Sequence, residues 1–460
     1  MNNIFEIQNV TNFSLNNCLF RNFSITLKSH ATDTTFENLE MENSHLVIGD
    51  FIGQEFQSKS IDRPSVISNL ILRNVSIWNS GFDLTPTSID HVYSYSLENI
   101  SVNGKEIFYM VDKFDMTIKS THGQFFLINC TNITFQDCEF DDTSDGLFVY
   151  YSNSIHVVNN SFGNANVRFA DSQSINIKNN LFQKRDPVWY FHNLMVKSGS
   201  DIRIENNSLT LGIRLGYITN STIRNNVMVG DCGLWLSEGD QVTIHNNRLG
   251  EKGIYFWWWN IDPMTEVPII NFNVTNNSVN GKPIYYFQHN TTIVLPEDSV
   301  QIILINCSMI EGSNLSLIEG NKTGLFCLGV IDLRIDNSSI SHSRMNNAIL
   351  GSERLQIENC TFISADISIK YSNEIMIRSS IFLDSTLDIR YGQVILKNCT
   401  FESFGEWTSG NVYTSVFCMN SDLRVFGTSI TNYPYGIRSL DGSVYVESST
   451  FLNISSVVTE

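Results

Sequence analysis

Charged residues are scarce in this chain, and so are proline and alanine. Asp, Glu, Lys and Arg make up 17% of the 460 residues, and the chain has 8 prolines and 5 alanines. Alanine is the strongest helix former, so its scarcity argues against a helical protein. The 47 acidic residues outnumber the 29 basic ones, which gives a net charge of −18. This charge argues against a nucleic-acid partner, and no apolar run approaches the roughly 18 residues of a membrane span.

Neither terminus resembles a targeting signal or a cap. Met1 is followed by NNIFEIQNVTNFSLNNCLF, and the chain closes with VYVESSTFLNISSVVTE. The opening stretch lacks the basic and apolar regions of a secretion signal. Both ends look like interior repeat, although solenoids need polar caps. We therefore expect a piece of a longer protein, and the missing signal says little about its location.

The chain repeats itself at long range. SVNGKEIFYMVDK begins at Ser101, and SVNGKPIYYFQHN begins at Ser278, 177 positions later. The same offset relates the stretches that begin at Gln124 and Gln301. A register kept over this length indicates an internal duplication. We predict degenerate coils over 1–96, a first module over 97–273 and a second module over 274–460, all in one continuous solenoid.

A shorter repeat of about twenty residues runs through both modules. Its template is apolar, any, apolar, any, Asn, then Asn, Cys or Ser, any, Phe, as in IHVVNNSF (155–162) and LQIENCTF (355–362). Alternation with period two predicts strands that have one face inward. We expect the aligned asparagines to point inward and to form a hydrogen-bonded ladder; they are Asn159, Asn179, Asn206, Asn225, Asn246, Asn359 and Asn398.

A unit of this size cannot bury a core alone, so the repeats must stack. Parallel coils about 4.8 Å apart would align the apolar, Phe and Asn positions in columns. The sequence therefore predicts an all-β fold: a single-stranded right-handed parallel β-helix with an Asn ladder and inserted loops.

The pattern G-L-x-L-x-x-S-x-x-I-x-I-x-N-N resembles repeats of the pectin-lyase-like superfamily. More narrowly, it is similar to the periplasmic copper-binding (NosD-type) β-helix family and to carbohydrate-binding and sugar-hydrolase repeat domains. The long element from SVNGKPIYYF to QIILINC is similar to segments of archaeal cell-surface proteins of that group. This fold hosts lyases, hydrolases, adhesins and spacers, so the resemblance implies a fold and not a chemistry.

Six of the nine cysteines follow the aligned Asn position and share one predicted register. They are Cys18, Cys130, Cys138, Cys307, Cys360 and Cys399. Cys360 and Cys399 stand two coils apart with Ser380 between them, too far for a disulfide. We predict that these cysteines pack in the core.

Twenty Asn-x-Ser/Thr sequences look like glycosylation acceptors. Those on the predicted ladder, such as Asn159 and Asn359, should be unusable because we expect their side chains to point inward. Asn290, Asn314 and Asn321 remain as exposed acceptors. The nine histidines are scattered, so we predict no metal site among them.

An acidic turn offers the strongest signal for catalysis. Asp141, Asp142 and Asp145 could act as acid and base on a glycosidic bond, or hold Ca²⁺. The motif order of polygalacturonases, which have this fold, is absent. An exposed acidic turn is therefore the favoured interpretation, and we predict no cofactor beyond this possible Ca²⁺.

Two insertions concentrate aromatic residues. One, over 251–270, contains Tyr255, Trp257, Trp258 and Trp259, and the other, over 183–199, contains Trp189 and Tyr190. Exposed rings on loops can stack on sugars. We predict that these residues bind a glycan; a loop that plugs a groove is the alternative.

Three functions remain open. The favoured one is a non-enzymatic extracellular or cell-surface protein that binds a polysaccharide or cell-surface glycan, or assembles with envelope proteins or with itself. The second is a carbohydrate-active lyase, hydrolase or epimerase. The third is a NosD-type accessory protein of metal-enzyme maturation, with a periplasmic location.

Overall fold

The structure, a computed structural model, confirms the predicted all-β parallel β-helix: a parallel β-solenoid of about 18 turns. It describes residues 3–49, 66–84, 89–119, 123–141, 145–183, 192–256, 270–317, 324–341, 347–404 and 414–459. Among these residues the one helix is α2 (Ile89–Tyr93). The chain divides into two compact units, Met1–Ile244 with Ile269–Asn273, and His245–Pro268 with Val274–Glu460. The module boundaries at 97 and 274 remain predictions.

The first unit begins with long strands and continues with coils of three strands each. Strands at the same place in successive coils pair side by side, and each such series is called a wall. The early strands are β1 (Asn3–Thr11), β2 (Ser14–Arg21), β3 (Phe23–Glu42), β4 (Leu46–Ile48), β5 (Ile67–Trp78), β6 (Phe82–Leu84) and β7 (Ser96–Val102). The first wall has β8 (Lys105–Val111), β10 (Gln124–Ile128), β13 (Asp145–Tyr150), β16 (Asn166–Ala170), β19 (His192–Ser200) and β24 (Gly233–Leu236). The second wall has β9 (Phe114–Ile118), β11 (Thr131–Gln136), β14 (Asn153–Val158), β17 (Gln173–Lys178) and β20 (Arg203–Glu205). The strand β22 (Gly212–Arg224) runs through both walls. The third wall has β12 (Glu139–Asp141), β15 (Ser161–Gly163), β18 (Leu181–Gln183), β21 (Ser208–Leu209) and β23 (Val227–Met228).

The second unit repeats the three walls. Its first wall has β27 (Gly253–Phe256), β30 (Lys282–Gln288), β32 (Gln301–Ile305), β35 (Leu325–Leu328), β38 (Asn347–Leu350), β41 (Ile367–Lys370), β44 (Leu387–Arg390), β47 (Thr414–Met419), β50 (Tyr435–Leu440) and β53 (Ser456–Thr459). Its second wall has β31 (Thr291–Val294), β33 (Ser308–Ser313), β36 (Ile331–Asp336), β39 (Glu353–Glu358), β42 (Asn373–Arg378), β45 (Gln393–Lys397), β48 (Asp422–Phe426) and β51 (Ser443–Glu447). Its third wall has β26 (Arg248–Leu249), β29 (Ser278–Val279), β34 (Ser316–Leu317), β37 (Ser339–Ser341), β40 (Thr361–Ile363), β43 (Ile381–Leu383), β46 (Thr400–Glu402), β49 (Ser429–Thr431) and β52 (Thr450–Leu452). The strands β25 (Gly239–His245) and β28 (Ile270–Thr275) lie at the division between the units.

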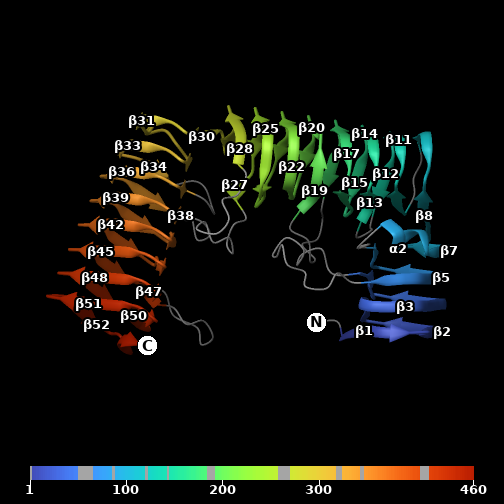
Figure 1. The fold of residues 1–460 in the computed structure, drawn as a ribbon, viewed down its shortest axis with the longest axis horizontal. Helices are drawn as coiled ribbons and strands as arrows, with labels where there is room; N and C mark the ends of the chain where they lie inside the picture. The colour runs from blue at the N-terminus through green and yellow to red at the C-terminus, as the bar shows by residue number, and fades with distance from the viewer. Residues whose placement is uncertain are drawn as a thin grey trace. The chain divides into compact units, whose positions relative to one another are not determined.

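Identical positions of successive coils stack, because the strands pair in parallel without a shift. Figure 1 shows this for the series from β36 to β51. The predicted Phe column is present: the rings of Phe362 and Phe382 lie 4.6 Å apart, and those of Phe382 and Phe401 lie 4.3 Å apart. All three side chains are buried. The face-to-face rings therefore form a buried column at the strand spacing along the third wall.

The aligned asparagines do not point inward, so this part of the prediction is wrong. All seven are exposed, and their φ angles lie between 52° and 58°; they are Asn159, Asn179, Asn206, Asn225, Asn246, Asn359 and Asn398. Asn tolerates this left-handed conformation better than most residues. The conformation turns the chain at a corner and directs the Asn side chain outward. The sequons at Asn159 and Asn359 are therefore exposed as well, contrary to the expectation that they are hidden.

The ladder exists one residue later. In the first unit it consists of Asn160, Asn180, Asn207 and Asn226, which are each at most 2% exposed. The Oδ1 of Asn180 accepts hydrogen bonds from the backbone N–H and the Nδ2 of Asn160, at 2.9 and 3.0 Å. The same pair of bonds joins Asn180 to Asn207, and Asn207 to Asn226. Each buried amide is thus paired with the next coil.

The cysteines pack as predicted, but not in one register. All nine are free thiols, and eight are buried. The backbone N–H of Cys130 donates to Ser152 at one corner, whereas that of Cys138 donates to Asn160 at the other. Both corners need a residue with positive φ followed by an inward side chain, so the same Asn-Cys dipeptide fits either. The single predicted register is therefore wrong.

The duplicated segments contain two hairpins. The pairs β7–β8 and β29–β30 are antiparallel, and each turn is Asn-Gly with positive φ at both residues, as type I′ turns require. The stretch that follows each hairpin begins with a buried glutamine, Gln124 or Gln301. The Gln124 amide bonds the N–H and C=O of Phe82, and the Gln301 amide bonds those of Ile254. In each copy the hairpin interrupts the coil, and the side-chain amide of the glutamine forms the hydrogen bonds that a neighbouring strand would otherwise form.

Candidate functional site

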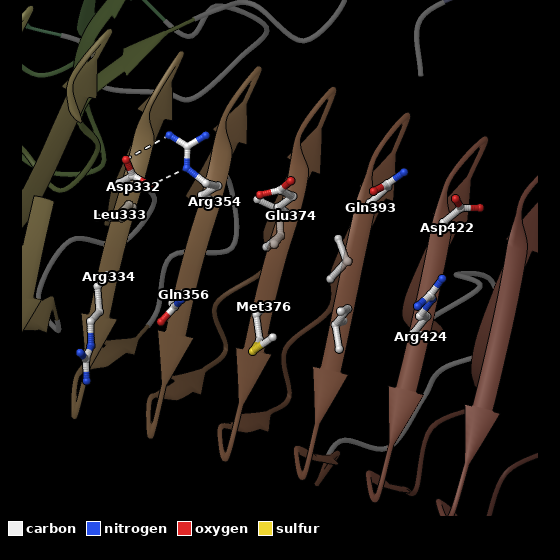
Figure 2. A pocket seen from close by; sticks show the side chains of 13 residues that line it. Asp332, Leu333, Arg334, Arg354, Gln356, Glu374, Met376, Gln393, Asp422 and Arg424 are labelled. Atoms are coloured by element: carbon white, nitrogen blue, oxygen red, sulfur yellow. Dashed lines mark hydrogen bonds and ion pairs between the residues drawn. The ribbon is translucent and has the colours of Figure 1, made fainter. Parts of the chain in front are cut away.

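The outer face of the second wall in the second unit is hollowed. Along β36, β39, β42, β45 and β48, alternate residues point inward and are buried, among them Leu333, Leu355 and Ile375. Their outward neighbours line a hollow of about 610 Å³. Figure 2 shows these side chains in two rows on the same face. We call this surface the second-wall hollow.

The first row consists of Asp332, Arg354, Glu374, Gln393 and Asp422. Asp332 and Arg354 have φ angles of 58° and 55°, and both are skipped in the strand pairing without a change of register. The Nε of Arg354 binds Asp332 Oδ1 at 2.6 Å, and its Nη2 binds Oδ2 at 3.1 Å. These hydrogen bonds lower the pKa of the Asp332 carboxyl and raise the pKa of Arg354. Because both groups are exposed, the pair orients the side chains more than it stabilises the fold.

The second row is less acidic and partly apolar. It consists of Arg334, Gln356, Met376, Ile395 and Arg424. Met376 and Ile395 are half-buried and form an apolar floor between the charged ends.

The hollow as a whole carries no net formal charge. Three carboxylates balance three guanidinium groups: Asp332, Glu374 and Asp422 against Arg334, Arg354 and Arg424. Within the described residues, the side chains of Glu374 and Arg424 have no hydrogen-bond or ion-pair partner, although the charge of Glu374 helps to raise the pKa of Arg354. Donors and acceptors around an apolar floor suit an uncharged ligand with many hydroxyl groups.

Two stacked tyrosines lie beside this hollow, at the corner between the first and second walls. The rings of Tyr371 and Tyr391 are nearly parallel, with centroids 4.8 Å apart. Their φ angles are 52° and 54°, a conformation that is uncommon for a bulky residue but that Tyr151 and Tyr217 adopt as well. Tyr391 is 43% exposed and lines an open hollow of about 640 Å³, which shares Gln393 and Asp422 with the second-wall hollow. The two hollows form one strip around the corner.

A group of cations lies on the outer face of the first wall. Lys370 on β41 is next to Arg390 on β44. Burial lowers the pKa of Lys370, and the charge of Arg390 lowers it further. Arg390 binds Asp388 at 2.9 Å, and the guanidinium groups of Arg390 and Arg438 lie 5.5 and 5.9 Å from the ring centre of Phe417. These contacts hold the two arginines in place, and Asp388 already offsets the charge of Arg390.

The structure leaves the acidic-turn hypothesis open. Asp141 ends β12 and is half-buried, and its Oδ1 has no hydrogen-bond partner among the described residues. Asp142 and the side chain of Asp145 lie outside the described residues. Catalysis and Ca²⁺ binding by this turn therefore stay predictions.

Most of the predicted aromatic site lies outside the described residues. This applies to Trp189, Tyr190, Trp257, Trp258 and Trp259. Tyr255 lies on β27 and is only 6% exposed. A ring that is buried in this way presents no face to a sugar, so the prediction is not supported for Tyr255.

Residues 74–255 match the family described as "Periplasmic copper-binding protein (NosD)". The resemblance to NosD-type β-helix repeats is confirmed for these residues. They make up less than half of the chain. No protein of curated function matches the chain in sequence.

Three solved structures are similar in fold. The surface adhesin PfbA of Streptococcus pneumoniae is 10% identical, with 77% of this chain and 91% of PfbA covered and a TM-score of 0.22. The tailspike of E. coli bacteriophage HK620, in complex with a pentasaccharide, is 9% identical, with 96% and 72% covered and a TM-score of 0.26. The PL6 family alginate lyase AlyGC is 10% identical, with 99% and 94% covered and a TM-score of 0.21. At these values the likeness says nothing about activity or ligand.

The NosD description names copper, but the described residues do not fit a copper site. Copper favours imidazole and soft sulfur ligands. Within the described part of the chain, no three His, Cys, Asp or Glu side chains gather closely enough to hold a metal ion. The cysteine thiols instead bond backbone carbonyls inside the coils, as Cys130 does with Met110. Among the described residues there is also no helix long and apolar enough to span a membrane.

Sequence reasoning missed the strip because the repeat template leaves outward positions open. Arg354, Glu374 and Asp422 stand where the template allows any residue. The tyrosines had a usable signal: Tyr371 and Tyr391 occur twenty residues apart, at a corner position where neighbouring coils have Asn420 and Asp441. A bulky residue repeated at a position suited to Asn is the feature to search for.

Proposed function

We propose that the chain is part of an extracellular or cell-envelope β-helix protein that binds an uncharged glycan along the strip from the second-wall hollow to Tyr391. The stacked pair of Tyr371 and Tyr391 is the observation that carries the proposal. Exposed tyrosine rings present flat apolar area to a sugar ring, and their hydroxyls stay in water. Tyr151 and Tyr217 adopt the same left-handed backbone in the first unit, so the stacking of the two rings, and not the backbone beneath them, supports the proposal.

The polar groups of the strip support the same ligand class. Glu374 accepts hydrogen bonds, Arg424 donates them, and Gln393 does both. Met376 and Ile395 offer apolar contact between these groups. Because the six charges of the hollow cancel, a strongly anionic glycan gains little there. A linear glycan that runs across the strands would contact equivalent positions at each strand spacing of about 4.8 Å.

Binding of a panel of neutral oligosaccharides tests the proposal, first on an array and then by calorimetry for the best ligand. The informative variant is Tyr391→Asn, since Asn keeps the left-handed corner and removes only the ring. We expect at least a tenfold loss of affinity, about 1.4 kcal/mol. Tyr93→Asn, a change at an exposed tyrosine of the first unit, is the matched control.

A Trp257→Ala/Trp258→Ala variant separates the two predicted glycan sites. If it abolishes binding and Tyr391→Asn does not, the insertion over 251–270 is the site and the strip is not. If neither variant weakens a measured interaction, or no neutral glycan binds the folded protein, glycan recognition by these surfaces is wrong.

A further inference from the structure

A serine, a histidine and an aspartate form a chain of hydrogen bonds in the first unit, far in sequence from the proposed glycan strip. The Oγ of Ser80 lies 3.2 Å from Nδ1 of His45. The other ring nitrogen, Nε2, lies 2.9 Å from Oδ2 of Asp83. Both contacts are normal hydrogen-bond distances. All three residues lie in the predicted degenerate coils of 1–96, where the repeat template is weak.

The proton positions follow from the chemistry of the three groups. Asp83 carboxylate can only accept, so the neutral His45 ring carries its proton on Nε2 and donates it to Asp83. The Nδ1 of His45 is then an acceptor, and the Ser80 hydroxyl donates to it. A hydroxyl, an imidazole and a carboxylate linked in this order activate a serine for attack on a carbonyl carbon, although here the two ring nitrogens exchange the roles that they have in the usual triad, where the serine bonds Nε2 and the carboxylate bonds Nδ1.

Asp83 is the most buried of the three residues, and His45 and Ser80 are each partly exposed, as an activated serine requires. The side chain of Asp83 is 3% exposed and that of His45 is 20% exposed. Ser80 is partly exposed, in the turn between Asn79 and β6. The carboxylate is therefore shielded, and the hydroxyl lies at the surface end of the chain.

Two further contacts hold Asp83 in position. The Nη2 of Arg168 lies 3.1 Å from Asp83 Oδ1, so the arginine binds the oxygen that His45 does not use. The residue before Asp83, Phe82, has its N–H and C=O fixed by the Gln124 amide. Because Arg168 offsets the charge of Asp83, it weakens the support for a positive imidazole. We therefore expect slow turnover.

We propose that Ser80 is a nucleophile for acyl transfer, with His45 as its base and Asp83 as the positioning residue for His45. The substrate class is a carboxylic ester. The Ser80 oxygen bonds to the carbonyl carbon while its proton passes to Nδ1 of His45. The carbon–alkoxide bond then breaks, and the leaving alkoxide takes that proton from His45. Water attacks the acyl-serine in the same way and releases the acid and free Ser80, so the net reaction is ester and water to acid and alcohol.

A fluorophosphonate probe tests the nucleophile directly, because it forms a covalent bond only with an activated serine. The full chain is incubated with the probe, and the adduct is located by peptide mass spectrometry. We expect one adduct on Ser80, none in Ser80→Ala, and unchanged labelling in the control Ser76→Ala, a change at a partly exposed serine of β5.

The role of His45 has a readout that a purely structural role would not change. His45→Ala should lower the labelling rate, and the hydrolysis of p-nitrophenyl acetate, by about 10²–10⁴-fold. Added imidazole should restore part of both rates by taking the vacated place. Melting curves of all variants show whether each one is folded.

Three outcomes overturn the proposal. They are a folded parent protein that takes no label at Ser80, labelling of other serines at an equal rate, and a folded His45→Ala variant that labels as fast as the parent. If His45→Ala is unfolded, the comparison of parent and Ser80→Ala decides alone. None of these variants changes a residue of the glycan strip. A failure of the acyl-transfer proposal therefore leaves the glycan proposal unaffected, and the reverse also holds.

Discussion

Substitution of a ladder asparagine is the sharpest test of the coil register. Asn180→Ala removes four hydrogen bonds: two that its Oδ1 accepts from Asn160, and two that its Nδ2 donates to Val157 and Asn207. At a net value of about 0.5–1.5 kcal/mol each, the loss amounts to roughly 2–6 kcal/mol. The upper part of the range applies if the buried partners find no water.

The neighbouring residue supplies the control. Asn179 is exposed, and its one side-chain hydrogen bond within the described residues, to Asn159, is 3.3 Å long. Its φ is 55°, which glycine adopts freely. We therefore expect Asn179→Gly to change stability by no more than about 0.5 kcal/mol.

Solenoids can unfold in parts, so a urea midpoint should be combined with hydrogen exchange. The backbone N–H of Asn160 donates to the Asn180 side chain and loses its acceptor in Asn180→Ala. This amide and its neighbours should exchange faster in that variant and not in Asn179→Gly. Equal effects of the two substitutions, or a larger effect of Asn179→Gly, would refute the register described above.

Three other outcomes are expected. Phe382→Ala should cost about 3–5 kcal/mol, measured by urea unfolding, because Phe382 is buried between two stacked rings; a smaller loss would show that the column can collapse. Gln124→Ala and Gln301→Ala should each cost roughly 1–3 kcal/mol by leaving a buried N–H and C=O unpaired, and a large difference between them would contradict a shared role. Burial raises the pKa of Cys360 and of Cys418 from 9.0 to about 11. The stability that these thiols contribute should be complete below pH 9 and lost as the pH rises towards 11, and a melting temperature that stays constant over that range would contradict it.

The sequence determined the coil because the coil depends on local chemistry. Period-two alternation and the recurring Phe position are patterns within a single repeat, and both were visible in the sequence. The inward Asn could not be assigned in the same way. In an Asn-Asn pair such as Asn159-Asn160, the sequence does not show which residue takes the positive φ, and that choice decides which side chain points inward.

The candidate sites were harder to predict because they join residues from different coils. The contact between Tyr371 and Tyr391 spans one coil, and the chain from His45 to Asp83 spans 38 positions. Neither has a fixed spacing that a motif could capture. Strand pairing brings them together, so they become visible only when the register is known.

The directional ladder also constrains how such a chain can change its length in evolution. Each ladder asparagine that lies between two others accepts hydrogen bonds from the asparagine of the coil before it and donates hydrogen bonds to the asparagine of the coil after it. If one complete coil is deleted, the ladder asparagines on either side of it can form the same hydrogen bonds with each other. No buried amide then loses its partner. The rung from Asn180 to Asn207 spans 27 residues rather than the 20 from Asn160 to Asn180, yet its bonds are as short. Extra residues are tolerated away from the corner, so related chains should differ by whole coils or by loops, and seldom by small insertions at a rung.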